Sequence, residues 1–389
     1  MNNEELLDIL YDNGKDTLTA VLKIQFAQSS MEEIEDFVSV FGKLCQIAQY
    51  IGLQGDYLTN ILCQKDSALL NEGSFSEFLE TYEEGLKQFL LDVISCRQHI
   101  CIIKRNDEIP GLASHIITNI GQVVSALSQG KVPVIDTRNC KNSFTALSQA
   151  ENRNIWEKYF IQPCKLSLDE VEEHMHISYA EGIPGFYPSY KMDDLDNPIL
   201  MQFWRNAASK YLRFSDYMES KLAVVKDALD WEHKRVLGVI CRGTDYTELK
   251  PYNHPVQPNP VMVIEDAKQL MEQYKCDYCY LATEDEKIYK QFQDAFGERL
   301  LFTQRFLYKD VKGTVLNKYN EQNAIDSGEK NEEYLISLKL LAECCCFIGG
   351  RTSGSVVAAI LSKGFDFFYL YDEGRYGIDN LNTLKSYIC

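Results

Sequence analysis

The 389-residue sequence contains no apolar run that approaches the roughly 18–20 residues of a membrane-spanning helix. Basic charge is also scarce, because 39 lysines and arginines stand against 57 aspartates and glutamates, for a formal net charge of −18. Such a surface repels phosphate backbones, so we do not expect the protein to bind nucleic acid. The acidic N-terminus lacks the basic and apolar regions of a secretory signal, and a cytoplasmic location is therefore expected, with the membrane periphery as the alternative.

Cysteine is abundant, with 13 residues, but its spacing does not indicate a metal site. Cys276-x-x-Cys279 has metal or redox spacing, yet neither a second such pair nor a histidine pair accompanies it, which favours a buried structural pair. Cys344, Cys345 and Cys346 open a segment with the pattern of a strand, whose adjacent side chains point to opposite faces. We therefore expect reduced thiols and no bound metal or other cofactor.

The periodicity of apolar residues divides the chain into three parts. Residues 1–95 have helical spacing and predict a helical extension, either an added layer or the contact of a homodimer. Residues 96–230 begin with the strand, glycine loop, helix and strand of a βαβ unit, and residues 231–389 again alternate strands with helices. This pattern predicts an α/β protein with two parallel sheets and a cleft between them.

The strongest candidate for a binding loop is the segment 349–355, GGRTSGS, between a predicted strand and a predicted helix. Ligands of open parallel sheets bind beyond the carboxyl ends of the strands. The glycines allow close approach, and hydroxyl groups with the free N–H groups of the following helix suit an anion. A flexible connection with Ser353 or Ser355 as an ordinary N-cap is the alternative. Neither a Walker ending nor a GxGxxG fingerprint is present.

Three further loops fall at predicted strand ends. Arg242 follows an apolar strand and precedes Gly243, so its planar guanidinium can hold phosphate oxygens or pair with Asp245 at the surface. One of the other two loops could hydrogen-bond ribose, base or sugar hydroxyls, or could simply cap a helix. The glycine turn of the other could reach across the cleft toward the donor, and its histidine either touches substrate or only lies on a helix face. Their candidate residues are Thr283, Glu284 and Asp285 in one loop, and Gly111, Ser114 and His115 in the other.

Several of these segments carry a family resemblance, in the same order along the chain. Arg242-Gly243-Thr244-Asp245 matches three of the four positions of an Arg-Arg-Thr-Asp hallmark, and His254-Pro255 follows at the family's spacing. The sequence YLATED at 280–285 and the strand, serine-rich loop and helix at 347–361 also match. The second α/β segment thus resembles the donor domain of the α-1,6-fucosyltransferases (GT23-type) and, more loosely, the wider fucosyltransferase superfamily. The resemblance covers about residues 97–365 and is closest over 236–365.

The resemblance implies a GT-B-type fold, in which two Rossmann-like domains face each other, and an inverting, metal-independent glycosyltransferase. Residues 96–230 would then form the acceptor side and residues 231–389 the donor domain. Arg242 would hold the β-phosphate, and Glu248, with Asp245 as substitute, would act as catalytic base. The implied donor-binding residues are Gly243, Thr244, His254, Thr283, Glu284, Asp285, Arg351, Thr352, Ser353, Gly354 and Ser355, and Gly111, Ser114 and His115 would face the acceptor.

Two departures from the family pattern qualify this prediction. The second arginine of the hallmark is Gly243 here, and we expect Arg351 to supply the missing charge from the facing loop. The acidic residue near guanine would be Glu332 or Glu333. The expected function is transfer of a sugar, fucose from GDP-fucose, to a glycan hydroxyl. The alternatives are a catalytically degenerate nucleotide-sugar-binding protein and a glycosyltransferase that uses another nucleotide sugar.

Overall fold

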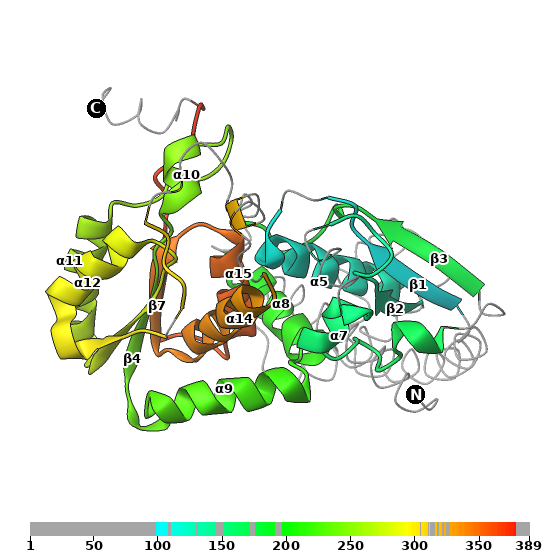
Figure 1. The fold of residues 1–389 in the computed structure, drawn as a ribbon, viewed down its shortest axis with the longest axis horizontal. Coiled ribbons are helices and arrows are strands. Elements are labelled where there is room, and N and C mark those ends of the chain that lie inside the picture. Colours follow the sequence, from blue (N-terminus) through cyan, green and yellow to red (C-terminus); the bar gives the residue numbers. More distant parts are fainter. Residues whose placement is uncertain are drawn as a thin grey trace, which may run out of the picture.

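The structure is a computed structural model of the chain (Figure 1), and the residues that it describes lie between positions 99 and 378. The predicted helical extension at 1–95 and its homodimer contact fall outside these residues. The side chains of Asp245 and Ser327 are also outside the description. Within the described range the structure leaves out residues 108–109, 130, 143, 145–150, 172–175, 191–196, 304, 310, 312–315, 317–318, 321–322 and 324–326.

The first unit is built on a three-stranded parallel sheet in the order β2-β1-β3. Helix α5 (Leu112–Ser128) crosses from β1 to β2, which confirms the predicted βαβ unit. The central strand is buried along its middle, as the apolar sequence HICIIK requires of a strand covered on both faces. The strands are β1 (His99–Lys104), β2 (Val132–Ile135) and β3 (His176–Glu181).

The chain between β2 and the second sheet is mainly helical, and local caps set where its two longer helices begin. Asn197 accepts hydrogen bonds from the first turn of one helix and Pro198 occupies its first position, while Ser215 caps the next helix. The α-helices are α7 (Ile155–Tyr159), α8 (Pro198–Tyr211) and α9 (Asp216–Ala228), and the 3₁₀ turns are η1 (Leu168–Glu170) and η3 (Trp231–His233).

The second unit is a five-stranded parallel sheet in the order β6-β5-β4-β7-β8. Its helices and strands alternate along the chain as the sequence predicts. The strands are β4 (Val236–Ile240), β5 (Tyr278–Ala282), β6 (Leu300–Leu301), β7 (Cys346–Gly350) and β8 (Phe367–Tyr371). The helices are α10 (Thr244–Leu249), α11 (Pro260–Gln273), α12 (Glu286–Phe296), η4 (Gly297–Arg299), α14 (Ser327–Glu343) and α15 (Ser353–Leu361).

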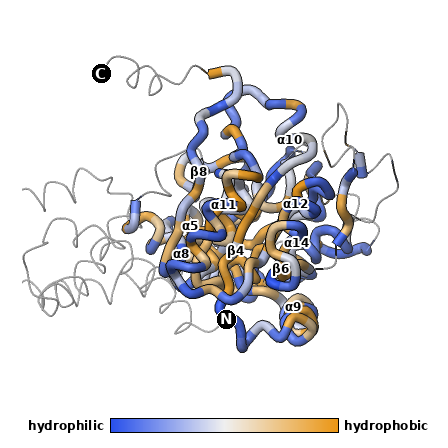
Figure 2. Tube along the Cα trace, turned by 90° about the vertical axis from the view of Figure 1, so that its left-hand side faces the viewer, coloured by the Kyte–Doolittle hydropathy of each residue, from blue (hydrophilic) through white to orange (hydrophobic). Residues whose placement is uncertain are grey.

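Alternating side chains of the second sheet enter two separate apolar clusters. Leu237 and Val239 of β4 pack with α11 and α12, whereas Val236 and Ile240 belong to the cluster that contains α14 and α15. Helix α15 also packs against α5 and α8 of the first unit, so that cluster runs from one sheet to the other. Apolar strands accordingly fill the middle of the molecule in Figure 2. The shared core fixes the two sheets relative to each other and thereby the shape of the space between their loops.

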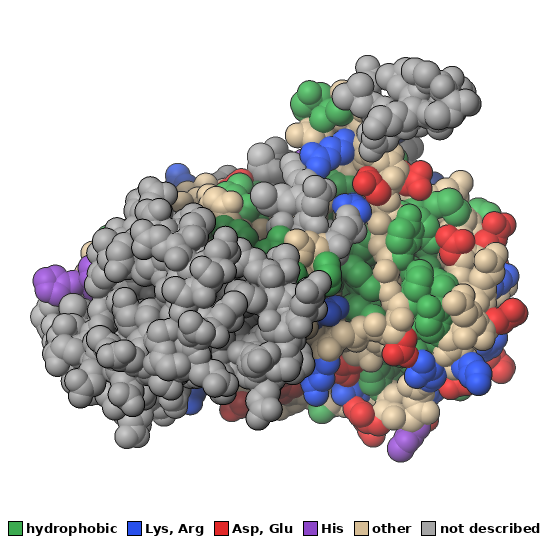
Figure 3. Space-filling view, turned by 180° about the vertical axis from the view of Figure 1, so that it is seen from behind, with side chains coloured by type: hydrophobic (Ala, Val, Ile, Leu, Met, Phe, Trp, Pro, Cys, Tyr) green, Lys and Arg blue, Asp and Glu red, His purple; other side chains and the backbone are tan. Residues whose placement is uncertain are grey.

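The described residues contain no membrane span, and the face of the molecule drawn in Figure 3 shows no continuous basic patch. No helix in the described part of the chain is long and apolar enough to cross a bilayer. On the face drawn in Figure 3, acidic and basic side chains alternate over the described residues instead of separating into patches of one sign. A phosphate-bearing ligand must therefore be held by a few cations placed locally.

Candidate functional site

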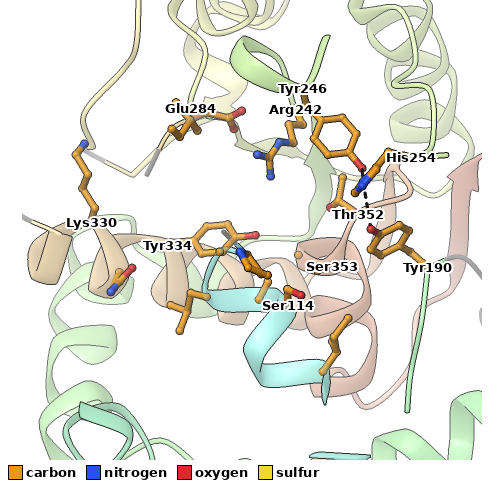
Figure 4. Close-up of a pocket in the computed structure, with 18 of the residues that line it drawn as sticks. Ser114, Tyr190, Arg242, Tyr246, His254, Glu284, Lys330, Tyr334, Thr352 and Ser353 are labelled. Atoms are coloured by element: carbon orange, nitrogen blue, oxygen red, sulfur yellow. Dashed lines mark hydrogen bonds between the residues drawn. The ribbon is translucent and has the colours of Figure 1, made fainter. Parts of the chain in front are cut away.

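A cavity of about 600 Å³ opens where the carboxyl ends of strands from both sheets meet (Figure 4). Loops that follow β1, β4, β5, β6 and β7 line it, together with the first half of α14. This is the place at which open parallel sheets bind their ligands. The polar side chains that line it include Arg105, Asp107, Ser114, Tyr190, Arg242, Tyr246, His254, Glu284, Arg305, Lys330, Asn331, Glu333, Tyr334, Thr352 and Ser353.

The N-terminus of α15 forms one wall of the cavity. Thr352 caps this helix, since its Oγ1 accepts a hydrogen bond of 3.2 Å from the amide of Ser355. Thr352, Ser353 and Gly354 line the cavity, and a side chain at Gly354 would overlap the hydroxyl of Tyr334. Ser355 was expected to bind the donor, but it is fully buried and its Oγ donates to the carbonyl of Gly350. Ser355 therefore shapes the turn, while the free amides of the helix face the cavity.

Arg242 lies on the wall that adjoins α15. Its guanidinium carbon is 4.8 Å from the centre of the Tyr246 ring, and both side chains line the cavity. The structure thus brings Arg242 and the start of α15 to one space, as an anion site would require. Arg351, which was expected to face Arg242, is not among the described residues that line the cavity. Its Nη2 lies 3.9 Å from a carboxylate oxygen of Asp372.

Three cations that line the cavity were missed by the sequence analysis: Arg105, described below, and Arg305 and Lys330. Arg305, after β6, has a buried Nε without a hydrogen-bond partner among the described residues. Lys330, on α14, places its Nζ 3.8 Å from the centre of the Phe306 ring. Burial lowers the pKa of Lys330 to about 8. Neither residue stands beside a glycine-rich turn or in a recognisable motif, so the sequence offers no signal for them.

The loop after β5 explains why glycine replaces the second arginine of the hallmark. A side chain at Gly243 would overlap the carboxylate of Asp285, whose Oδ2 accepts a hydrogen bond of 3.1 Å from the amide of Thr244. Asp285 also caps α12, and Thr283 is buried with its Oγ1 accepting from the Asp285 amide. Glu284, in contrast, lines the cavity and accepts a hydrogen bond of 3.0 Å from the hydroxyl of Thr244.

The described carboxylates of the cavity do not include Glu248, which the sequence analysis selected as the base. Glu248 is exposed and does not belong to the described residues that line the cavity, and the side chain of Asp245 lies outside the description. Among the described residues, the carboxylates that do line it are Asp107, Glu284 and Glu333.

A group of aromatic and imidazole side chains joins the two units at one end of the cavity. The Nδ1 of His254 is 2.9 Å from the hydroxyl of Tyr246 and 3.4 Å from that of Tyr190, which comes from the first unit (Figure 4). Burial raises the pKa of both tyrosines, so both hydroxyls stay protonated at neutral pH. His254 therefore lies where sequence reasoning expected it, and its contacts link the donor side to the facing unit.

The first unit contributes the turn before α5. The Nη1 of Arg105 donates to the carbonyl and hydroxyl oxygens of Ser114 at 3.0 and 3.1 Å, which holds the turn in place. Gly111 and Ser114 line the cavity as expected, but His115 does not. His115 is 2% exposed, its ring lies edge-on to that of Phe144, and burial lowers its pKa to about 3. It is a neutral core histidine and not a cleft residue.

The cysteine-rich segments also differ from expectation. Cys345 precedes β7 in a bend, so the alternation of a strand does not apply between it and Cys346, the first residue of β7. Their sulfur atoms are 4.0 Å apart, and the sulfur of Cys276 is 3.4 Å from that of Cys345. The expectation that these adjacent side chains point to opposite faces of a strand therefore does not apply to Cys345 and Cys346.

The comparisons with known proteins give likenesses of structure alone. No protein-family model matches the chain, and no curated protein matches it in sequence. The chain is similar to solved fucosyltransferases. The fucosyltransferase NodZ from Bradyrhizobium is 11% identical, with a TM-score of 0.42 over 68% of this chain and 94% of that one. A variant of Arabidopsis thaliana FUT1 in complex with GDP is 8% identical, with a TM-score of 0.43 over 87% and 80% of the two chains. POFUT1 in complex with GDP-fucose is 11% identical, with a TM-score of 0.34 over 74% of this chain and 76% of that one.

Proposed function

We propose that this chain is a glycosyltransferase that moves fucose from GDP-fucose to a hydroxyl group of a glycan. The observation that carries the proposal is the convergence of Arg242 and the N-terminus of α15 on one cavity between the two sheets. The sequence resemblance at 242–255 and 280–285 favours fucose as the sugar. The same resemblance favours an inverting reaction. The cations of the cavity favour a reaction without a metal cofactor, because they can supply the charge that the leaving diphosphate requires.

The diphosphate would bind where the cavity offers both cations and hydrogen-bond donors. Arg242 approaches it from the end of β4, and the free amides of α15 approach it from the end of β7. Arg305 supplies the charge that the second arginine of the hallmark would carry, because Gly243 stands at that position and has no side chain. Burial raises the pKa of Tyr334, so its hydroxyl remains a donor for a phosphate oxygen. Fixed positive charge of this kind stabilises a leaving diphosphate most as its bond to the sugar breaks.

The nucleoside would extend from the diphosphate past β5 toward β6, the edge strand of the sheet. Lys330 and Glu333 lie one helical turn apart on α14 at that end of the cavity. A guanine offers an oxygen acceptor next to two N–H donors, so an ammonium beside a carboxylate complements it. Uracil and cytosine do not offer this arrangement. We therefore assign Lys330 to the guanine oxygen and Glu333 to the neighbouring N–H groups.

The acceptor hydroxyl must lose a proton when it attacks the sugar, and a carboxylate in reach can accept it. We assign this role to Glu284, because it enters the cavity from β5, next to the strand that carries Arg242 (Figure 4). Gly111 and Ser114 of the first unit line the facing wall, where a glycan would approach. The partners of the protein are thus a nucleotide-sugar donor and a glycan.

Calorimetric titration with GDP, UDP and CDP in the presence of a chelator tests the donor assignment. We expect selective binding of GDP, and a loss of at least about tenfold in GDP affinity for Arg242→Ala, since a hydrogen bond to a charged group contributes about 1.5–3 kcal/mol. Arg351→Ala is the matched control, because this arginine does not line the cavity, and its affinity should equal that of the wild type. A preference for UDP, or equal losses in the two variants, would overturn the assignment. GDP binding without transfer of fucose to any glycan of a broad panel would indicate a binding protein instead of an enzyme.

A further inference from the structure

Three thiols meet at the end of the second sheet that lies away from the cavity. Cys276 precedes β5, while Cys345 and Cys346 lie where α14 leads into β7, so the group stands at the amino ends of two strands. The three sulfur atoms all lie within 4.8 Å of one another. In the part of the chain that the structure describes, no other group of three or more histidine, cysteine, aspartate or glutamate side chains comes together this closely.

Two of the three thiols are buried, and the third opens to a cavity. Cys276 and Cys346 are buried, whereas Cys345 is half-buried and lines a second cavity of about 370 Å³. The charged residues that line the same cavity are Glu232, Lys234, Arg235 and Glu343. Arg235 pairs with Asp366, and its charge also acts on Cys276 and Cys345. The positive charge of Arg235 would therefore offset part of a negative charge on the sulfur cluster.

We propose that Cys276, Cys345 and Cys346 bind one zinc ion through their thiolates, with a water molecule as fourth ligand on the open side. Tetrahedral zinc with Zn–S bonds of about 2.3 Å places its sulfur ligands roughly 3.8 Å apart. The separations of 3.4 Å between Cys276 and Cys345 and 4.0 Å between Cys345 and Cys346 bracket this value. Three S–H bonds break, three Zn–S bonds form and three protons leave to water, so no oxidant or reductant is needed. The zinc thiolate group then carries one negative charge next to Arg235.

A disulfide between Cys276 and Cys345 is the competing use of these thiols. It would require an oxidant and would leave Cys346, which is buried between the same elements, without a role. Three sulfur ligands at metal-ligand separations favour zinc. The site lies outside the donor cavity, so it is independent of the proposed transfer reaction and would fasten the start of β5 to the junction of α14 and β7.

Metal content and cobalt substitution test the proposal. The full chain is purified under reducing conditions, equilibrated with Zn²⁺ and freed of unbound metal, and zinc per chain is measured by mass spectrometry; Co²⁺ is then exchanged for zinc. We expect about one zinc per chain and the near-ultraviolet charge-transfer absorption of cobalt thiolate. Cys276→Ala and Cys345→Ala should each bind metal at least about tenfold more weakly and lose this absorption.

Cys279→Ala is the matched control, because Cys279 completes the C-x-x-C spacing and is buried but does not belong to the group of three. It should bind zinc like the wild type. Zinc should also raise the thermal midpoint of the wild type and of Cys279→Ala but not that of Cys345→Ala, which separates loss of a ligand from loss of the fold. Absence of zinc uptake by the reduced wild type, equal uptake by Cys345→Ala, or a Cys276–Cys345 disulfide whose reduction restores no metal binding would each overturn the proposal.

Discussion

Glu332 and Glu333 are neighbours in α14, yet Glu332 joins the two units and Glu333 lines the cavity between them. Glu332 Oε1 lies 3.1 Å from the Nζ of Lys158, its Oε2 pairs with Lys221, and the hydroxyl of Tyr217 donates to it at 3.0 Å. Lys158 belongs to α7, and Lys221 and Tyr217 belong to α9, so this carboxylate is fully engaged at the junction. Of the two glutamates considered for guanine, only Glu333 is placed to meet a ligand.

Exchanging each glutamate for glutamine should therefore affect two different properties, which are GDP selectivity for Glu333 and stability for Glu332. Glu333→Gln removes the proposed acceptor of the guanine N–H groups, and we expect a loss of roughly tenfold or more in the preference for GDP over UDP with little change in stability. Glu332→Gln removes the carboxylate that Lys158 and Lys221 share, although Lys158 keeps its ion pair with Glu151. We expect a destabilisation of about 1–3 kcal/mol with unchanged GDP affinity. Chemical denaturation and calorimetric titration of both variants measure the two effects. Weaker GDP selectivity in Glu332→Gln alone would contradict the assignment.

Donor binding should weaken at alkaline pH because of Lys330. Burial lowers the pKa of this lysine to about 8, so it is cationic below that pH and becomes neutral above it. Only the cation donates a charge-assisted hydrogen bond to guanine. GDP affinity measured by calorimetry from pH 6.5 to 9.5 should thus stay level up to about pH 8 and fall above it. In Lys330→Gln the affinity should be lower at neutral pH and should lack this decline, and an identical decline in the variant would assign the effect to another group.

Gly243 should tolerate no side chain, although the related hallmark carries arginine at this position. A Cβ there would overlap the carboxylate of Asp285, which holds the amide of Thr244 beside Arg242. Gly243→Ala should therefore displace Arg242 and lower GDP affinity at least about tenfold, and Gly243→Arg should not restore a stronger clamp. Gly111→Ala is the control on the facing wall, where an added Cβ meets no atom within 4 Å. If Gly243→Ala bound GDP like Gly111→Ala, the close contact with Asp285 would not be needed for donor binding.

The sequence predicted those parts of the fold and site that depend on local patterns. Buried parallel strands appear as short apolar runs, so β1, β4, β5 and β7 could be located before any coordinates. A turn rich in glycine and hydroxyl residues before a helix predicted the start of α15, and an arginine at a strand end predicted Arg242. In each case the sequence pattern lies in the element that it predicts or within a few residues of it.

The missed residues depend on how distant segments pack. Arg305 and Lys330 reach the cavity because a loop after β6 and the first half of α14 fold over it, which no local spacing reveals. Arg351 stands in the right turn but its side chain lies outside the cavity lining, toward Asp372. Cys345 could be judged only once the bend before β7 was known, because strand alternation assumes that the strand has already begun.

Glu284 and Glu248 are two candidates for the catalytic base, and substituting each of them in turn can show which one acts. Glu284 lines the cavity and is held by the hydroxyl of Thr244, whereas Glu248 is exposed on α10. Glu284→Gln keeps the size of the side chain but removes the proton acceptor, so the rate of transfer from GDP-fucose should fall by about 10²–10⁴ while GDP affinity changes far less. Glu248→Gln should keep the wild-type rate. If Glu248→Gln lost activity and Glu284→Gln retained it, the attacking hydroxyl would have to lie over α10, outside the cavity in which the donor is placed.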